Sequence, residues 1–98
     1  MNFETFWNII KNNNGIELLT LSQKKPFLFK FDNSNDSIQI IPNSKDPRST
    51  NRIKFQEIWN IAKKSTTPFI PSQYAQITFN SSYLVAIMKH ILKNEKIE

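Results

Sequence analysis

The segment Phe27-Leu28-Phe29-Lys30-Phe31-Asp32 is the clearest indication of how this chain folds. Phenylalanine occupies every second position, and the residues between are a leucine, a lysine and an aspartate. Alternate side chains of a strand point to opposite faces, so the pattern places three phenyl rings on one face of a sheet. Rings on a sheet can stack on nucleic-acid bases, but three on one face are more typical of a packed core. The segment therefore predicts a half-buried central strand.

Two further strands are expected next to this one. Residues 16–21 are mostly apolar and suited to a strand, and residues 37–41 again alternate in polarity. The polar segments 22–26 and 33–36 between them have turn composition, and connections this short permit only antiparallel pairing. We therefore predict a three-stranded antiparallel meander.

Apolar residues at helical spacing predict three helices around the meander. The first covers residues 3–12, with Asn2 as its N-cap and Gly15 as its stop. The second carries a stripe from Phe55 to Ala62, and the third begins around Asn80-Ser81. The expected fold class is α+β, a helix, the meander and then two helices packed on one face of the sheet. All 98 residues are expected to form a single domain.

Composition restricts the cellular setting. The chain has twelve aromatic residues, enough for a packed core, and no cysteine, which excludes disulfides and thiolate metal sites. No stretch approaches the length of a transmembrane helix, and the N-terminus lacks the basic start of a signal peptide. We expect a cytoplasmic protein that does not contact a membrane.

Few residues suit catalysis. His90 is the only histidine and lies among lysines of the last helix, where a surface position is the simpler interpretation. The eight acidic residues are dispersed without metal-ligand spacing, and a single glycine excludes a glycine-rich phosphate loop. We expect no enzyme activity, no metal and no cofactor.

The chain is basic, with a formal net charge of +5 and an isoelectric point near 9.6. Such a charge attracts polyanions, including nucleic acid. Lysine outnumbers arginine eleven to two, and together with frequent Asn and Ile this is typical of an AT-rich genome. Part of the charge can therefore reflect codon usage alone.

Both arginines fall within residues 44–54, which lead from the third strand into the second helix. Cations, hydroxyls, amides and a helix N-terminus together can hold phosphate. The candidate ligands in this segment are Lys45, Arg48, Ser49, Thr50, Asn51, Arg52 and Lys54. If the helix starts early, Arg48 and Arg52 share one side of it. The alternative is a polar connecting loop with its cations in solvent.

Other lysines could extend this surface. Lys24 and Lys25 lie in the first turn, where they can equally protect a sheet edge, and Lys30 lies on the polar face of the central strand. A second group, Lys89, Lys93 and Lys96, is spaced along the last helix and is most simply a solvated helix face.

Residues 26–92 also carry a run of short motifs. These are a Pro-Phe strand, an Ile-Pro-Asn-Ser-Lys turn followed by arginines, an aromatic helix, Phe-Ile-Pro-Ser-Gln-Tyr, and Asn-Ser-Ser-Tyr-Leu-Val-Ala-Ile opening the last helix. The pattern resembles small modules of bacterial restriction and other DNA-processing proteins, in which the segment after the third strand is also basic. The resemblance implies a DNA-contacting accessory module with Lys45, Arg48 and Arg52 at the contact positions.

The leading hypothesis is a non-enzymatic DNA-binding module that grips the phosphate backbone through a basic loop between the third strand and the second helix. The alternative is a protein-interaction module, as a subunit, an inhibitor or a homodimer. Its motivation is the set of apolar residues left on outer faces, Leu19, Leu28 and Ile41.

Overall fold

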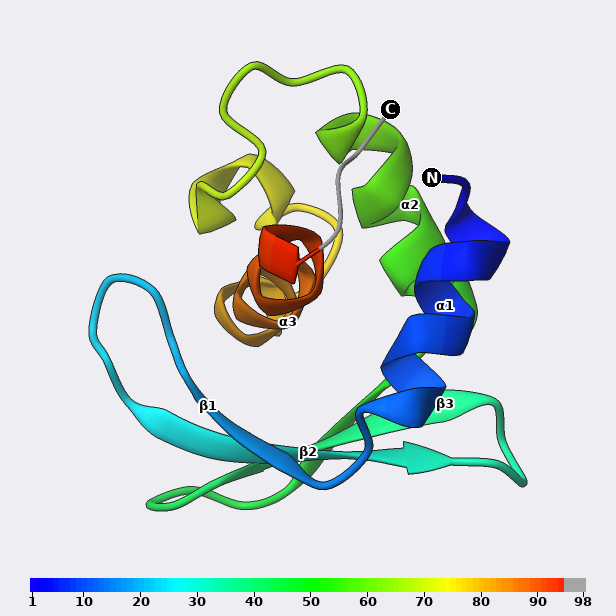
Figure 1. The fold of residues 1–98 in the computed structure, drawn as a ribbon. Helices are drawn as coiled ribbons and strands as arrows, with labels where there is room; N and C mark the ends of the chain where they lie inside the picture. The colour runs from blue at the N-terminus through cyan, green and yellow to red at the C-terminus, as the bar shows by residue number, and fades with distance from the viewer. Residues whose placement is uncertain (95–98) are drawn as a thin grey trace.

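The computed structural model describes residues 1–94 and has the α+β architecture that the sequence predicts. Its elements are α1 (Phe3–Asn12), β1 (Ile16–Leu19), β2 (Pro26–Asp32), β3 (Ser37–Pro42), β4 (Arg48–Asn51), α2 (Arg52–Ala62), the 3-10 helix η1 (Pro71–Tyr74) and α3 (Ser81–Asn94). The helices of this described part all lie over one face of the sheet, and the other face is open (Figure 1).

The sheet of the described chain has four strands in the order β1-β2-β3-β4, so the prediction of three strands is wrong. The additional strand is β4, inside the segment expected to be a loop, and it pairs antiparallel with β3. Its sequence is Arg-Ser-Thr-Asn, in which only Thr50 is buried, so it has no apolar alternation that would reveal it. Its register places Thr50 opposite Ile38 and Arg48 opposite Ile40, both on the face toward the helices.

The helix cap and the glycine turn predicted near the start of the chain are both present. The Asn2 side chain accepts a hydrogen bond from the Thr5 amide at 2.9 Å and so caps α1. Gly15 has a φ of +87°, a left-handed conformation that glycine adopts without strain, and it turns the chain from α1 into β1. Strand β1 ends at Leu19, earlier than predicted, because Thr20 already belongs to the following turn.

The alternation in β2 is a core pattern, as the sequence predicts. Phe27 and Phe29 are fully buried and Phe31 nearly so, and the facing residues of β3, Ile38 and Ile40, are also buried. These side chains form the floor of the core, and α1, α2 and α3 cover it (Figure 1).

Aromatic rings join α1 to α2. Phe6 stacks on Trp59 with ring centroids 4.5 Å apart, and Trp7 meets Phe31 edge to face at 5.6 Å. Trp7 and Trp59 are therefore core residues. This cluster holds the two helices over the β2 side of the sheet.

Helix α2 follows β4 without a loop. Asn51 is the last residue of the strand, and its side chain accepts a hydrogen bond from the Lys54 amide at 2.9 Å, which caps the helix. The helix therefore begins at Arg52, so Arg48 and Arg52 do not share one helix. No helix within residues 1–94 is long and apolar enough to cross a membrane.

Candidate anion-binding site

The turn between β1 and β2 is fixed by Thr20, which is buried. Its hydroxyl accepts a hydrogen bond from the Lys25 amide at 3.0 Å, and its own amide donates to the Lys25 carbonyl at 3.0 Å. The Lys24 amide donates to the Thr20 carbonyl, and Lys24 itself has a φ of 54°. These bonds close a tight turn and set the backbone from which the Lys25 side chain projects.

The turn between β3 and β4 carries Lys45, and β4 then begins with Arg48. Arg48 faces the helix side of the sheet, where its guanidinium lies 5.6 Å from the centre of the Tyr83 ring in the first turn of α3. Tyr83 is in turn held edge to face against Phe27 at 5.1 Å. The guanidinium is therefore positioned by a ring that belongs to the core.

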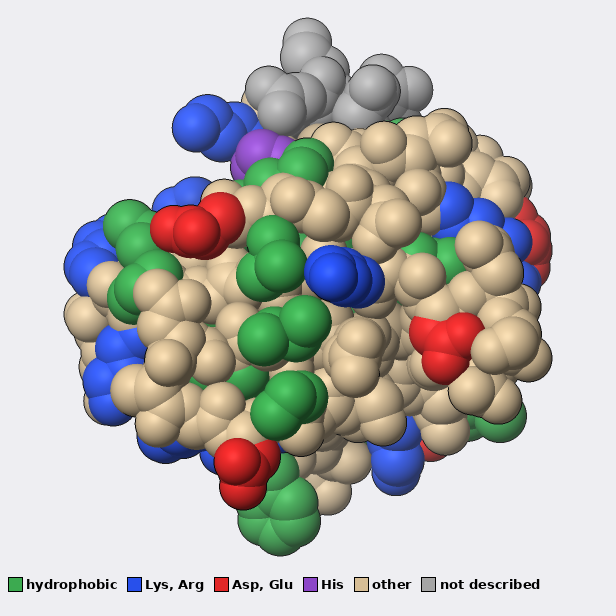
Figure 2. All heavy atoms as spheres, turned by 90° about the horizontal axis from the view of Figure 1, so that it is seen from below, with side chains coloured by type: hydrophobic (Ala, Val, Ile, Leu, Met, Phe, Trp, Pro, Cys, Tyr) green, Lys and Arg blue, Asp and Glu red, His purple; other side chains and the backbone are tan. Residues whose placement is uncertain are grey.

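These segments meet around a cavity of about 180 Å³. Its lining residues are Thr20, Ser22, Gln23, Lys25, Lys45, Arg48, Phe79, Ser82 and Tyr83. Among the described residues, three cations and no acid line it, and no salt bridge within residues 1–94 involves any of the three. Figure 2 shows Lys and Arg side chains along the left edge of the open face, where the β1–β2 and β3–β4 turns lie in Figure 1. We call this hollow the cationic cavity.

The start of α3 adds to this positive potential. Ser82 lies in the first turn of this helix and lines the cationic cavity. The Tyr83 amide of this turn donates to the Asn80 carbonyl at 3.0 Å, and the helix dipole favours an anion beside the first turn. Cations, hydroxyls and a helix N-terminus thus converge on a space with the chemistry of a phosphate or sulfate site.

Arg52 lies elsewhere. Its guanidinium forms a salt bridge with Glu4 and lies 3.8 Å from the Asp36 carboxylate, and it sits over the Phe3 ring at 5.5 Å. Asp36 also accepts a hydrogen bond from the indole nitrogen of Trp7 at 3.0 Å. Arg52 therefore joins α1 to the β2–β3 turn, away from the cationic cavity.

The other predicted phosphate ligands of residues 44–54 do not lie together either. Thr50 is only 6% exposed and packs toward the core, and Asn51 caps α2. Ser49 faces the open side of the sheet, and Lys54 lies 4.0 Å from Glu57 one turn along α2. The alternation of β4 thus distributes these side chains between two faces.

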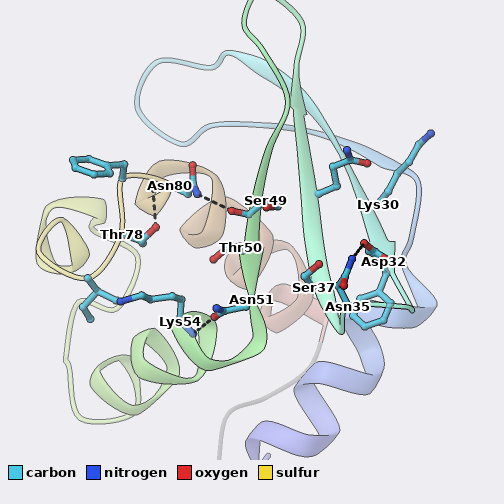
Figure 3. Close-up of a pocket in the computed structure, with 14 residues that line it drawn as sticks. Lys30, Asp32, Asn35, Ser37, Ser49, Thr50, Asn51, Lys54, Thr78 and Asn80 are labelled. Carbon is cyan, nitrogen blue, oxygen red and sulfur yellow. Dashed lines mark hydrogen bonds between the residues drawn. The ribbon is translucent and has the colours of Figure 1, made fainter.

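A larger hollow lies beside β4 on the open side of the sheet, with a volume of about 970 Å³ (Figure 3). Its floor includes Lys30, Gln39 and Ser49, which occupy one cross-strand row because Lys30 pairs with Gln39 and Gln39 with Ser49. Its wall includes Lys54 and residues 77–80, of which Thr78 and Asn80 lie on the β4 side in Figure 3. We call this hollow the polar groove.

One carboxylate lies in the polar groove, that of Asp32. Its oxygens accept hydrogen bonds from the Ser34 hydroxyl at 2.7 Å and the Asn35 amide at 2.8 Å. These bonds stabilise the ionised form and lower the pKa of Asp32 below its ordinary value. Asp32 is on β2, two strands from β4, whereas Asn80 lies beside β4, so Asp32 stands across the groove from residues 77–80 (Figure 3).

Of the second lysine group, neither Lys89 nor Lys93 lines either hollow. Lys89 is exposed on α3, and its ammonium lies 5.9 Å from the centre of the Phe69 ring, whereas Lys96 is outside the described residues. Within residues 1–94 there is no group of three His, Cys, Asp or Glu residues that could hold a metal ion.

Phe79, Ser82 and Tyr83 were not among the predicted ligands, although they line the cationic cavity together with the predicted Lys25, Lys45 and Arg48. The sequence signal was present, because Asn80-Ser81-Ser82 does mark a helix start. Nothing along the chain indicated that this start would lie against the two hairpin turns. No protein-family model, curated protein or solved structure was found to match this chain.

Proposed function

We propose that this protein binds nucleic acid, most simply DNA, through its phosphate backbone, with Lys25, Lys45 and Arg48 as the central contacts and Lys24 beside them. The observation that carries the proposal is the convergence of three cations from two separate hairpin segments on one cavity that no acid of the described chain lines. Each cation that neutralises a phosphate releases condensed counterions, which gives a favourable and salt-dependent contribution.

The proposed contact surface is not the single basic loop of residues 44–54 that the sequence predicts. Arg52 is already engaged by Glu4 and Asp36, so we assign it to stability and leave it out of the contact set. Arg48 is kept because its guanidinium borders the cationic cavity and retains its five donors for a phosphate oxygen or a guanine edge.

The test is fluorescence anisotropy with a labelled random-sequence duplex at about 50 and 200 mM salt. The double variant Lys25→Ala/Lys45→Ala should reduce the slope of log affinity against log salt by about 2, since each lost contact removes about 0.9. A matched control is Lys63→Ala/Lys64→Ala, which removes the same charge from the exposed end of α2, away from the sheet.

Equal slopes for the two double variants would show that net charge, not the cationic cavity, drives binding. No binding of the unaltered protein at low salt would refute the proposal itself.

A protein-interaction role is the second candidate, supported by the open face of the sheet. Leu28 and Ile41 are direct cross-strand partners on that face, and Leu19 on the edge strand β1 is 51% exposed. Figure 2 shows hydrophobic side chains in a row across this face. Sedimentation of the isolated protein tests self-association, and a strict monomer that captures no partner would count against this candidate.

A further inference from the structure

Phe79 is the most exposed large hydrophobic residue of the described chain, at 97%, against 66% for Ile53. It lines both the cationic cavity and the polar groove, and so stands between them. A ring in such a position offers both of its faces to a ligand.

The segment that carries Phe79 is held on both sides. Before it, the amides of Ile77 and Thr78 donate to the Tyr74 carbonyl at 2.9 and 3.2 Å. After it, the Asn80 amide donates to the Thr78 hydroxyl at 3.0 Å, and the Asn80 side chain donates to the Ser49 carbonyl of β4 at 3.5 Å. The ring therefore projects outward from a defined backbone rather than from a loose loop.

We propose that the polar groove holds an unpaired segment of nucleic acid, with one base stacked on Phe79 and the adjoining phosphate in the cationic cavity. This inference rests on the proposed function and specifies its ligand as single-stranded. Proteins that bind single strands combine a positively charged track with aromatic rings on which bases stack, and Phe79 lies beside such a track. In a duplex both faces of an internal base are covered by its neighbours, so the ring can stack on an internal base without intercalation only where that base is unpaired.

The groove supplies further suitable groups. Lys30 and Lys54 bring positive charge to its floor and wall, and Gln39, Ser49 and Asn80 bring amide and hydroxyl groups that can bond base edges (Figure 3). The single carboxylate, Asp32, is engaged by Ser34 and Asn35 and stands across from residues 77–80. A strand running from the cationic cavity past Phe79 thus meets cations before it meets an acid.

The test measures anisotropy with labelled oligothymidylate and with a duplex of equal length, under identical salt. Phe79→Ala should weaken binding of the single strand by about 5- to 150-fold, the equivalent of one lost base stack, and should leave duplex binding unchanged. Phe79→Tyr should restore single-strand affinity because it keeps the ring. Ile53→Ala is the matched control, since it removes an exposed hydrophobic side chain from α2 that lines neither hollow.

The outcomes separate this inference from the proposed function. If Phe79→Ala and Ile53→Ala bind the single strand equally well while Lys25→Ala/Lys45→Ala binds weakly, the phosphate contacts stand and the stacking site is refuted. If the unaltered protein prefers the duplex, the single-strand assignment is also refuted. If the unaltered protein binds neither probe, both the stacking site and the proposed nucleic-acid binding are refuted.

Discussion

Arg52 shows how one side chain can serve stability in a segment that looks suited to binding. It contacts carboxylates on α1 and on the β2–β3 turn, and its guanidinium covers the Phe3 ring. Partly exposed ion pairs and cation–π contacts each contribute a fraction of a kcal/mol to about 1 kcal/mol. Because Arg52 makes several, we assign it a structural role.

We predict that Arg52→Ala lowers the free energy of unfolding by about 1–2 kcal/mol, measured by urea denaturation. Arg52→Lys should recover only part of this loss, because an ammonium cannot fork between two carboxylates as a guanidinium can. Binding of DNA should be unchanged in both variants. Equal stability of Arg52→Ala and the unaltered protein would contradict the structural role.

The sequence could not separate the two arginines because their partners are distant in the chain. Arg48 depends on Tyr83 and Arg52 depends on Glu4, and no local pattern links these pairs. The phenyl rings of β2 were predictable for the opposite reason: the alternation of a strand is a local property that reports directly which side chains face the core. Lys25 and Lys45 were identifiable as cations, but not as neighbours.

At the scale of elements, β4 shows where pattern reading fails. An edge strand needs only its backbone bonds to β3 and one buried side chain, Thr50, so its sequence can stay polar throughout. Because the side chains of a strand alternate between its two faces, Thr50 points to the core and Ser49 to the open face, although both residue types can bind phosphate. The N-cap of α1 was predictable, because capping depends on residues within one turn.

The 3-10 helix η1 is secured by Tyr74, whose ring is fully buried and whose hydroxyl donates to the Pro68 carbonyl at 2.6 Å. Burial raises the pKa of Tyr74 above its ordinary value of 10.0. A raised pKa in the folded state means that the folded protein holds this proton more tightly than the unfolded chain. The resulting stabilisation is complete below pH 10.0 and is lost as the pH rises through the folded-state pKa.

We therefore predict that the free energy of unfolding falls as the pH rises above 10.0, and that it falls less steeply in Tyr74→Phe. The substitution should also cost about 1 kcal/mol near neutral pH, because it removes the bond to Pro68. Tyr83→Phe is the control and should keep the decline, since Tyr74 is intact. An unchanged pH dependence in Tyr74→Phe would refute this assignment. Urea denaturation at each pH provides the measurement.

At the scale of the molecule, one continuous core joins the sheet to the helices. Buried residues from α1, α2, α3, η1, β2 and β3 belong to a single cluster, so no described element has a hydrophobic core of its own. The cationic cavity touches this cluster at Tyr83 and the polar groove touches it at Phe31, whereas the side chains that the binding variants remove lie outside it. Binding and folding can therefore be altered separately by substitution, which is what makes the matched variants above informative.

A single core predicts cooperative unfolding. Both tryptophans lie in the ring cluster between α1 and α2, so their fluorescence reports on the helices, whereas Ile40 is buried in the sheet between β2 and β4. We predict that Ile40→Ala destabilises the protein by about 2–4 kcal/mol and shifts the urea transitions of tryptophan fluorescence and far-ultraviolet circular dichroism equally. The slope of unfolding free energy against urea should stay near 1 kcal/mol/M, a value typical of small domains. Separate transitions for the two signals would show that the helices and the sheet unfold as independent units, and the single-core interpretation would then be wrong.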